Sequence, residues 1–134
     1  MKTFGLDTNV VLRLILDDDP AQRRAALIFG AGLGREHSAF LSLISLLELD
    51  WALRSQYGFQ KTDVATAIGK LLHTRGLAVE HHSMVVQALR LVESSNADFA
   101  DALIACRSLD VGCVSIKTFD KKAAGKIPGM ELLA

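Results

Sequence analysis

Four carboxylates that lie far apart in the sequence occupy positions typical of a metal-binding site. They are Asp7, Glu48, Asp101 and Asp120. Asp7 directly follows the short apolar segment 3–6, which predicts a β-strand. In open parallel sheets the carboxyl ends of the strands share one edge, and ligands bind there. Asp7 is therefore a candidate ligand at the end of a first strand.

Glu48 and Asp101 lie among apolar residues in predicted helices. A buried carboxylate without a partner is costly, so Glu48 is expected either to bind a metal or to form a salt bridge with Arg54 or another cation. Asp98 and Asp101 are three residues apart and share a helix face. Asp101 is the candidate ligand of the two, and Asp98 is expected to support it or to cap the helix.

Asp120 follows a predicted strand and is surrounded by Lys117, Lys121 and Lys122. Two interpretations remain open: a solvated ion pair in a loop, or a metal ligand beside lysines that contact phosphate. Carboxylates brought close together repel one another unless a cation compensates them. An all-oxygen set suits Mg²⁺ or Mn²⁺, which bind phosphate oxygens and activate water. The four acids thus predict hydrolysis of a phosphodiester.

Alternating strands and helices are needed to position these acids. Strands are predicted at 3–6, 39–41, 77–80, 111–115 and 130–133. Helices are predicted at 10–16, 20–29, 43–56, 63–72, 83–92 and 98–109, with a short turn at 121–125. Asp19, Ser42 and Thr62 are the expected caps of three of these helices. The alternation predicts a mostly parallel sheet between layers of helices, with the strand ends on a common edge.

Length and composition fit one globular domain spanning residues 1–134, with 50% apolar and 22% charged residues. Fifteen basic and fifteen acidic residues give zero net charge, which argues against a strongly basic, nonspecific nucleic-acid binder. No apolar run reaches the ~18 residues of a membrane span, so we expect a cytoplasmic protein. Cys106 and Cys113 are expected to be buried thiols.

Four short motifs, in this order, resemble the PIN-domain family and, within it, the VapC-type toxins of bacterial toxin–antitoxin pairs. They are Asp7-Thr8-Asn9, Ser42 and Ser45 ahead of Glu48, ADFADALIA at 97–105, and Thr118-Phe119-Asp120 ahead of Pro128-Gly129. The resemblance implies a three-layer α/β/α sandwich with a mostly parallel sheet of about five strands. It also implies a homodimeric, Mg²⁺- or Mn²⁺-dependent endoribonuclease.

The resemblance further implies roles for particular residues. The metal ligands and catalytic acids would be Asp7, Glu48, Asp101 and Asp120. The supporting residues would be Thr8, Asn9, Asp98 and Thr118. Candidate contacts with the RNA backbone are Lys121, Lys122, Arg23 and Arg24. The implied partner is a small cognate antitoxin whose C-terminal tail obstructs the site.

Three other classes of protein share part of this pattern. A haloacid-dehalogenase-type phosphatase needs a second Asp two positions after the first, and Asn9 stands there. A response-receiver domain needs paired acids ahead of the phosphorylated Asp, and no acid precedes Asp7. The alternative that stays open is a catalytically idle PIN-like domain that binds RNA or a partner.

Overall fold

The computed structural model describes residues 1–134 as an alternation of short strands and helices. The strands are β1 (Thr3–Gly5), β2 (Ser38–Leu41), β3 (Leu77–Val79), β4 (Ile116–Thr118) and β5 (Met130–Leu132). The helices are α1 (Thr8–Ile15), α2 (Pro20–Ala31), α3 (Leu43–Tyr57), α4 (Lys61–Leu72), α5 (His82–Ser95), α6 (Phe99–Asp110) and α7 (Lys121–Lys126). None of these helices has both the length and the apolar character that a membrane span requires.

All strand pairs are parallel, as the alternation with helices predicted. The expected α/β sandwich class with a parallel sheet is confirmed. The strands do not all join one sheet, however: β1, β2 and β3 form the main sheet in that order, and β4 pairs with β5 alone. The outer edge of β1 therefore has no neighbouring strand, and its three residues are exposed. Acids that follow β1 and β4 consequently do not share one sheet edge.

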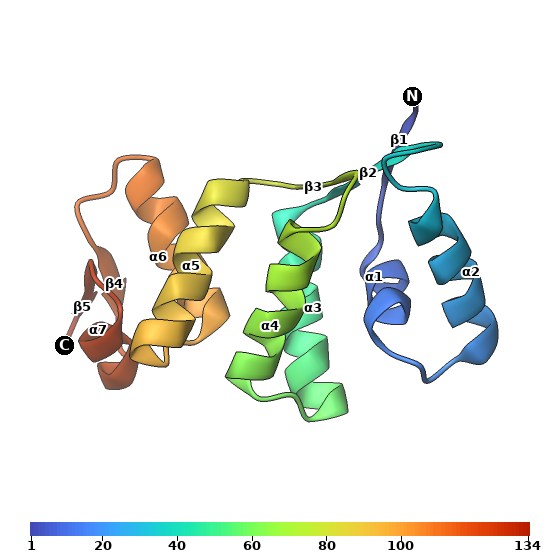
Figure 1. Ribbon diagram of the computed structural model, residues 1–134. Helices are drawn as coiled ribbons and strands as arrows, with labels where there is room; N and C mark the ends of the chain where they lie inside the picture. The colour runs from blue at the N-terminus through green and yellow to red at the C-terminus, as the bar shows by residue number, and fades with distance from the viewer.

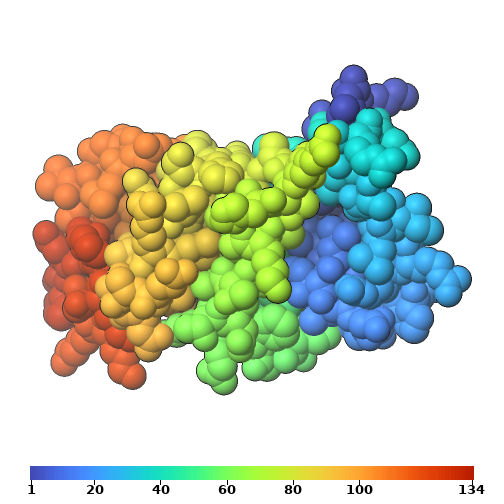
Figure 2. All heavy atoms as spheres, in the orientation of Figure 1, coloured from blue at the N-terminus to red at the C-terminus, as the bar shows by residue number.

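The helices lie side by side along the molecule, with α1 next to α2, α3 next to α4 and α5 next to α6 (Figure 1). The main sheet lies along one end of these helices. The two-stranded sheet and α7 lie at the opposite end of the molecule from β1. In the space-filling view the colours pass from blue to red across the long dimension of the molecule (Figure 2). The first strand and the last strands are thus well separated.

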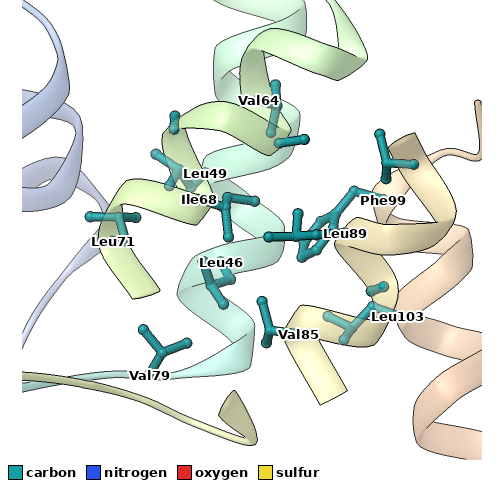
Figure 3. Packing of buried hydrophobic residues seen from close by; sticks show 14 of the residues in the cluster. Leu46, Leu49, Val64, Ile68, Leu71, Val79, Val85, Leu89, Phe99 and Leu103 are labelled. Carbon is teal, nitrogen blue, oxygen red and sulfur yellow. The ribbon is translucent and has the colours of Figure 1, made fainter. Parts of the chain in front are cut away.

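One core of 30 buried residues holds these elements together. Its centre is formed by α3, α4, α5 and α6, where Leu46 and Leu49 meet Ile68, Leu89 and Phe99 (Figure 3). Leu46, Leu49 and Ile68 are fully inaccessible to solvent. Burial of each such side chain contributes about 1.5–3 kcal/mol, so these helices form the most strongly packed part of the protein.

The helix starts predicted from single residues are confirmed at two positions. The Asp19 carboxylate accepts a hydrogen bond from the Gln22 backbone N–H at 3.1 Å, and Pro20 is the first residue of α2. The Ser42 hydroxyl accepts one from the Ser45 N–H at 3.2 Å. These caps satisfy backbone donors that have no partner inside the helix.

Other local predictions were wrong. Residues 111–115 form a turn rather than a strand, because Gly112 adopts a φ of 96° after α6 and β4 begins only at Ile116. Helix α4 begins before Thr62, since the Asp63 carboxylate accepts a hydrogen bond from the Gln60 N–H at 3.0 Å. Cys113, at this turn, is exposed rather than buried.

Candidate functional site

Asp7 and Glu48, which we call the N-terminal acid pair, are linked by Thr8. Asp7 caps α1, where its carboxylate accepts a hydrogen bond from the Thr8 N–H at 2.9 Å. The buried Thr8 hydroxyl donates to Glu48 Oε1 on α3 at 3.0 Å. Both carboxylates are exposed to solvent. The first turn of α1 thus holds two acids from segments 41 residues apart in the sequence.

Asp98, Asp101 and Asp120, the C-terminal acid group, lie around the start of α6. Asp98 caps this helix and accepts a hydrogen bond from the Asp101 N–H at 3.2 Å. Partial burial raises the pKa of Asp101, and the negative charges of Asp98 and Asp120 raise it further. Lys61 and Arg54 oppose this rise in pKa. Asp101 therefore lies close to other acids, whose effect on its pKa is opposed by basic side chains of the protein.

Asp120 is held at the start of α7. Its carboxylate accepts hydrogen bonds from the Lys122 and Ala123 N–H groups at 2.9 and 3.1 Å. The Asp120 N–H in turn donates to the Thr118 hydroxyl at 3.0 Å. The expected alternative, a loop ion pair with the flanking lysines, is wrong: Asp120 is in no salt bridge, and Lys117 pairs with Glu131 at 2.8 Å.

Arg54 joins α3 to the C-terminal acid group. Its guanidinium contacts the Asp50 carboxylate at 3.0 Å and the Asp98 carboxylate at 2.7 Å. The Asp50 side chain is only 3% exposed, and its burial raises its pKa while Arg54 opposes the rise. Arg54 also has a buried Nε without a hydrogen-bond partner. The bridge fixes α3 against the start of α6.

This bridge corrects the expectation that Glu48 is the buried acid of α3. Glu48 is exposed and Asp50 is the buried carboxylate. Glu48 lies on the same face of α3 as Ile44 and Trp51, which are apolar but 73% and 61% exposed, so the residue types on this face gave no sign of its exposure. That face is not the one that packs into the core. Asp50 is four residues from Arg54, the spacing at which an acid and a base on one helix meet.

Helix α3 contacts both α1, which follows Asp7, and α6, whose start carries Asp98 and Asp101. No three histidine, cysteine or acidic side chains lie close enough together to hold one metal ion. The donor atoms are of the type that Mg²⁺ and Mn²⁺ prefer, but their placement in this structure does not fit one ion.

The remaining predicted site residues lie in different places. Asn9 is exposed and lines a pocket of about 500 Å³ between β1, α1 and α2. Lys121 and Lys122 are exposed and directly follow Asp120. Arg24 is exposed on α2, remote in sequence from the C-terminal acid group. Of the four predicted RNA contacts, only the two lysines adjoin a candidate acid.

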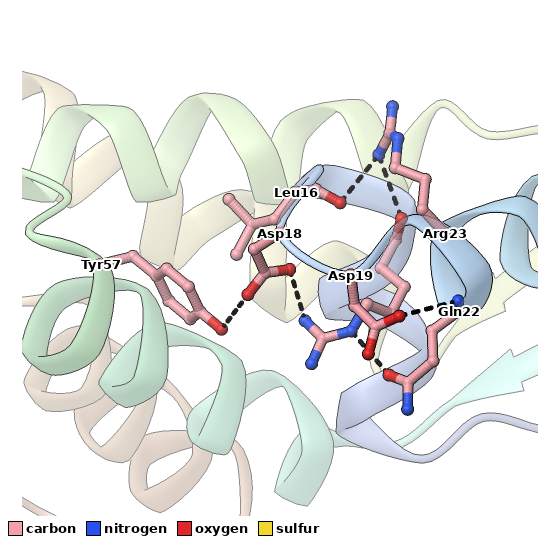
Figure 4. Close-up of polar contacts among 7 residues, drawn as sticks. Leu16, Asp18, Asp19, Gln22, Arg23 and Tyr57 are labelled. Carbon is pink, nitrogen blue, oxygen red and sulfur yellow. Dashed lines mark hydrogen bonds and ion pairs between the residues drawn. The ribbon is translucent and has the colours of Figure 1, made fainter.

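Arg23 and the acidic run before α2 have structural contacts (Figure 4). The Arg23 guanidinium donates to the Arg13 and Leu16 carbonyl oxygens at 3.0 and 3.1 Å, where α1 ends. Asp18 accepts hydrogen bonds from the Tyr57 hydroxyl at 2.7 Å and from Arg13 at 2.9 Å. This network ties the connection between α1 and α2 to the end of α3.

Parallel strands joined by helices, with acids at the helix starts, define an α/β protein. The family model of the PIN domain matches residues 5–126. The chain therefore belongs to the PIN-domain family, as the four sequence motifs indicated. Membership of this family supports a general class of activity, that of a nuclease-type hydrolase that uses divalent metal ions.

Solved structures and curated proteins give weaker comparisons. A toxin–antitoxin complex from Klebsiella pneumoniae is 17% identical over 98% of this chain and 96% of that chain, with a TM-score of 0.34. VapBC2 from Rickettsia felis, bound to a DNA fragment from its promoter, is 16% identical over 98% of this chain and 99% of that chain, with a TM-score of 0.38. No curated protein matches the chain significantly. The family assignment thus rests on the sequence model.

Proposed function

We propose that the chain is a Mg²⁺- or Mn²⁺-dependent endoribonuclease that acts as the growth-inhibiting toxin of a toxin–antitoxin pair. The observation that carries this proposal is the PIN-domain match over residues 5–126, a segment that contains all four candidate acids. An all-oxygen acid set is suited to the hydrolysis of phosphodiesters. The toxin role rests on the resemblance of the motif residues to VapC-type toxins.

In this proposal the cation is held by Asp7, Glu48, Asp101 and Asp120. When bound, it would supply the positive charge that binds phosphate oxygens and activates water. The N-terminal acid pair and the C-terminal acid group lie apart. They would therefore have to approach each other when the cation and RNA bind, so that one cation can contact all four acids. This approach would be a population shift driven by the higher cation affinity of the closed arrangement.

The protein's own residues have supporting roles in the proposal. Thr8 holds the Glu48 carboxylate through a hydrogen bond, and Asp98 fixes the first turn of α6 that contains Asp101. Thr118 fixes the backbone at Asp120, and Asn9 would orient a bound ligand. Lys121 and Lys122 would contact the RNA backbone.

The proposed partners are RNA, a small cognate antitoxin and a second copy of the chain. An antitoxin tail that inserts a basic residue among the acids would compensate the same charges as the cation. Inhibition would then follow because the basic residue and the cation compete for one site. We propose that residues 1–134 act as one domain in these complexes.

The test is cleavage of total cellular RNA by the purified protein in Mg²⁺ or Mn²⁺, read by sequencing new 5′ ends. Discrete cuts are expected, and they should vanish in EDTA and in the Asp7→Asn variant. Asp17→Asn is the matched control, because Asp17 is an exposed acid outside the acid groups. The Asp17→Asn protein should cut RNA at the same positions and to the same extent as the wild type. A folded protein that makes no cuts would refute the nuclease.

The required approach of the acids has its own measurement. Spin labels on Ala21→Cys in α2 and Gly125→Cys in α7 report the distance between the two ends of the molecule, with Cys106 and Cys113 replaced by serine. Mg²⁺ is expected to shorten this distance. An unchanged distance in a variant that still cuts RNA would show that the acids act without this closure.

The second candidate function is that of an RNA- or partner-binding PIN domain without catalysis. The observation that favours it is the separation of the acids into two groups. The same cleavage assay discriminates the two functions, because a binding module would leave RNA intact in Mg²⁺ and in EDTA alike.

A further inference from the structure

Two lysines from distant parts of the chain converge on one backbone carbonyl. Lys61, the first residue of α4, and Lys126, the last residue of α7, each donate to the Asn96 carbonyl oxygen at 3.3 Å. Both side chains are partly buried. Neither forms an ion pair with a carboxylate, since all five salt bridges of the protein involve other residues.

This arrangement leaves two ammonium groups at the surface without a carboxylate in contact. Two ammonium groups that share one acceptor repel each other, and a carbonyl oxygen carries only a partial negative charge. The Asp98 carboxylate, two residues after Asn96, is already paired with Arg54 at 2.7 Å. A compact anion with several oxygen acceptors would satisfy both ammonium groups at once, and a phosphate group has this form.

The lysine pair also lies beside the C-terminal acid group. Asn96 is two residues before Asp98, the cap of α6. The charge of Lys61 acts on the Asp101 carboxylate. A polyanion that follows the start of α6 would therefore meet two lysines and then the acids.

We propose that Lys61 and Lys126 form a binding site for one backbone phosphate of single-stranded RNA. This inference rests on the proposed function, because it assigns the lysine pair to the substrate of that site. The site fixes the strand next to the C-terminal acid group without reading its sequence, as phosphate contacts do. It differs from Lys121 and Lys122, the lysines indicated by the sequence. Those two side chains are exposed and share no hydrogen-bond acceptor.

The test measures binding without cleavage. A fluorescein-labelled single-stranded RNA of mixed sequence is titrated with Asp7→Asn protein in Mg²⁺, and anisotropy is recorded over a series of salt concentrations. The double variant Lys61→Gln/Lys126→Gln is expected to bind about tenfold more weakly. The slope of log affinity against log salt should fall by roughly 0.7, the value for one contact with a single-stranded phosphate.

Two controls separate a phosphate site from a general charge effect and from a structural role. Lys2→Gln/Lys70→Gln removes the same charge from exposed positions and should leave affinity and slope unchanged. Lys61→Arg/Lys126→Arg keeps the positive charge and should restore both. A purely structural role would lower the melting temperature of the glutamine variant and leave the salt slope unchanged.

Three results would overturn the inference. The glutamine variant could keep the salt slope of the Asp7→Asn protein, the Lys2/Lys70 control could weaken binding equally, or the Asp7→Asn protein could bind no RNA. A lysine-dependent salt slope in a protein that never cuts RNA would support the phosphate site and refute the nuclease. In a protein that does cut, the glutamine variant should raise KM and leave kcat unchanged.

Discussion

The N-terminal acid pair and the C-terminal acid group differ in how their negative charge is compensated. Asp7 and Glu48 are exposed and receive hydrogen bonds only from a backbone N–H and the Thr8 hydroxyl. The C-terminal group has Arg54 in contact with Asp98, and the charge of Lys61 acts on Asp101. Positive side chains of the protein therefore compensate the C-terminal acid group but not the N-terminal acid pair.

This difference suggests a division of roles between the two groups. The C-terminal group has its own fixed cations, so it can keep its shape without a bound ion. The N-terminal pair has no cation partner, so an ion from solvent or a basic residue from a partner gains most by binding there. The following predictions test this comparison from the largest expected effect to the smallest.

The largest effect is expected from amide substitutions of the proposed ligands. Asp7→Asn and Asp101→Asn should reduce RNA cleavage to the EDTA background, because each removes a carboxylate from the proposed cation site. Asparagine caps helices as well as aspartate does, so Asp7→Asn should keep α1 folded. Cleavage of labelled RNA and circular dichroism check the two statements. Full cleavage by both variants would contradict the assignment.

Removal of Arg54, the arginine that contacts the C-terminal acid group, should have the largest effect on stability. Arg54→Ala leaves Asp50 buried without a partner, so the free energy of unfolding should fall by about 3 kcal/mol. Urea denaturation measures this change. Arg107→Ala, which breaks an exposed pair with Asp110, should cost less than ~1 kcal/mol.

A second substitution tests whether the unpaired Asp50 causes that loss. In the Arg54→Ala background, Asp50→Asn should recover part of the stability, because a neutral amide is less costly to bury than a carboxylate. No recovery would show that Arg54 acts mainly through Asp98 or through its own packing.

Removal of the neutral partner from the N-terminal pair should have a smaller effect. Thr8→Val keeps the shape of the buried side chain but removes the hydroxyl that donates to Glu48. The expected loss is about 1 kcal/mol in the free energy of unfolding, together with slower cleavage. Thr62→Val, at an exposed position of α4, is the control and should change neither quantity. A loss as large as that of Arg54→Ala would remove the contrast between the two groups.

The smallest effect is expected at the exposed pair Lys117–Glu131, which joins β4 to β5. The hydrogen bond and the charge of Lys117 lower the pKa of Glu131. A lowered pKa adds stability above the ordinary pKa of the carboxyl group, and this stability is lost as pH falls through the folded-state pKa. Glu131→Gln should therefore lower the melting temperature slightly at pH 7, by no more than about 2 °C, and this difference should decrease as the pH falls towards 3. An equal difference at pH 7 and pH 3 would rule out this ionic contribution.

Local features of the fold were predictable from the sequence. The caps Asp19 and Ser42 act within three residues of themselves, so neighbouring residue types are enough to indicate them. The parallel strand pairs follow from the alternation of strands and helices. Residues 111–115 were misassigned because an apolar run cannot reveal that Gly112 turns the chain there.

The candidate acids show the same division between local and long-range information. The sequence by itself determined which acids lie at strand ends and helix starts, and their motifs indicated the PIN-domain family. Only the tertiary structure decided that Asp50 rather than Glu48 is buried, that the acids form two groups, and that Lys61 meets Lys126 at one carbonyl. The physical reason is that caps and periodicity depend on neighbours in the chain. Burial and charge pairing depend on which faces of distant helices pack together.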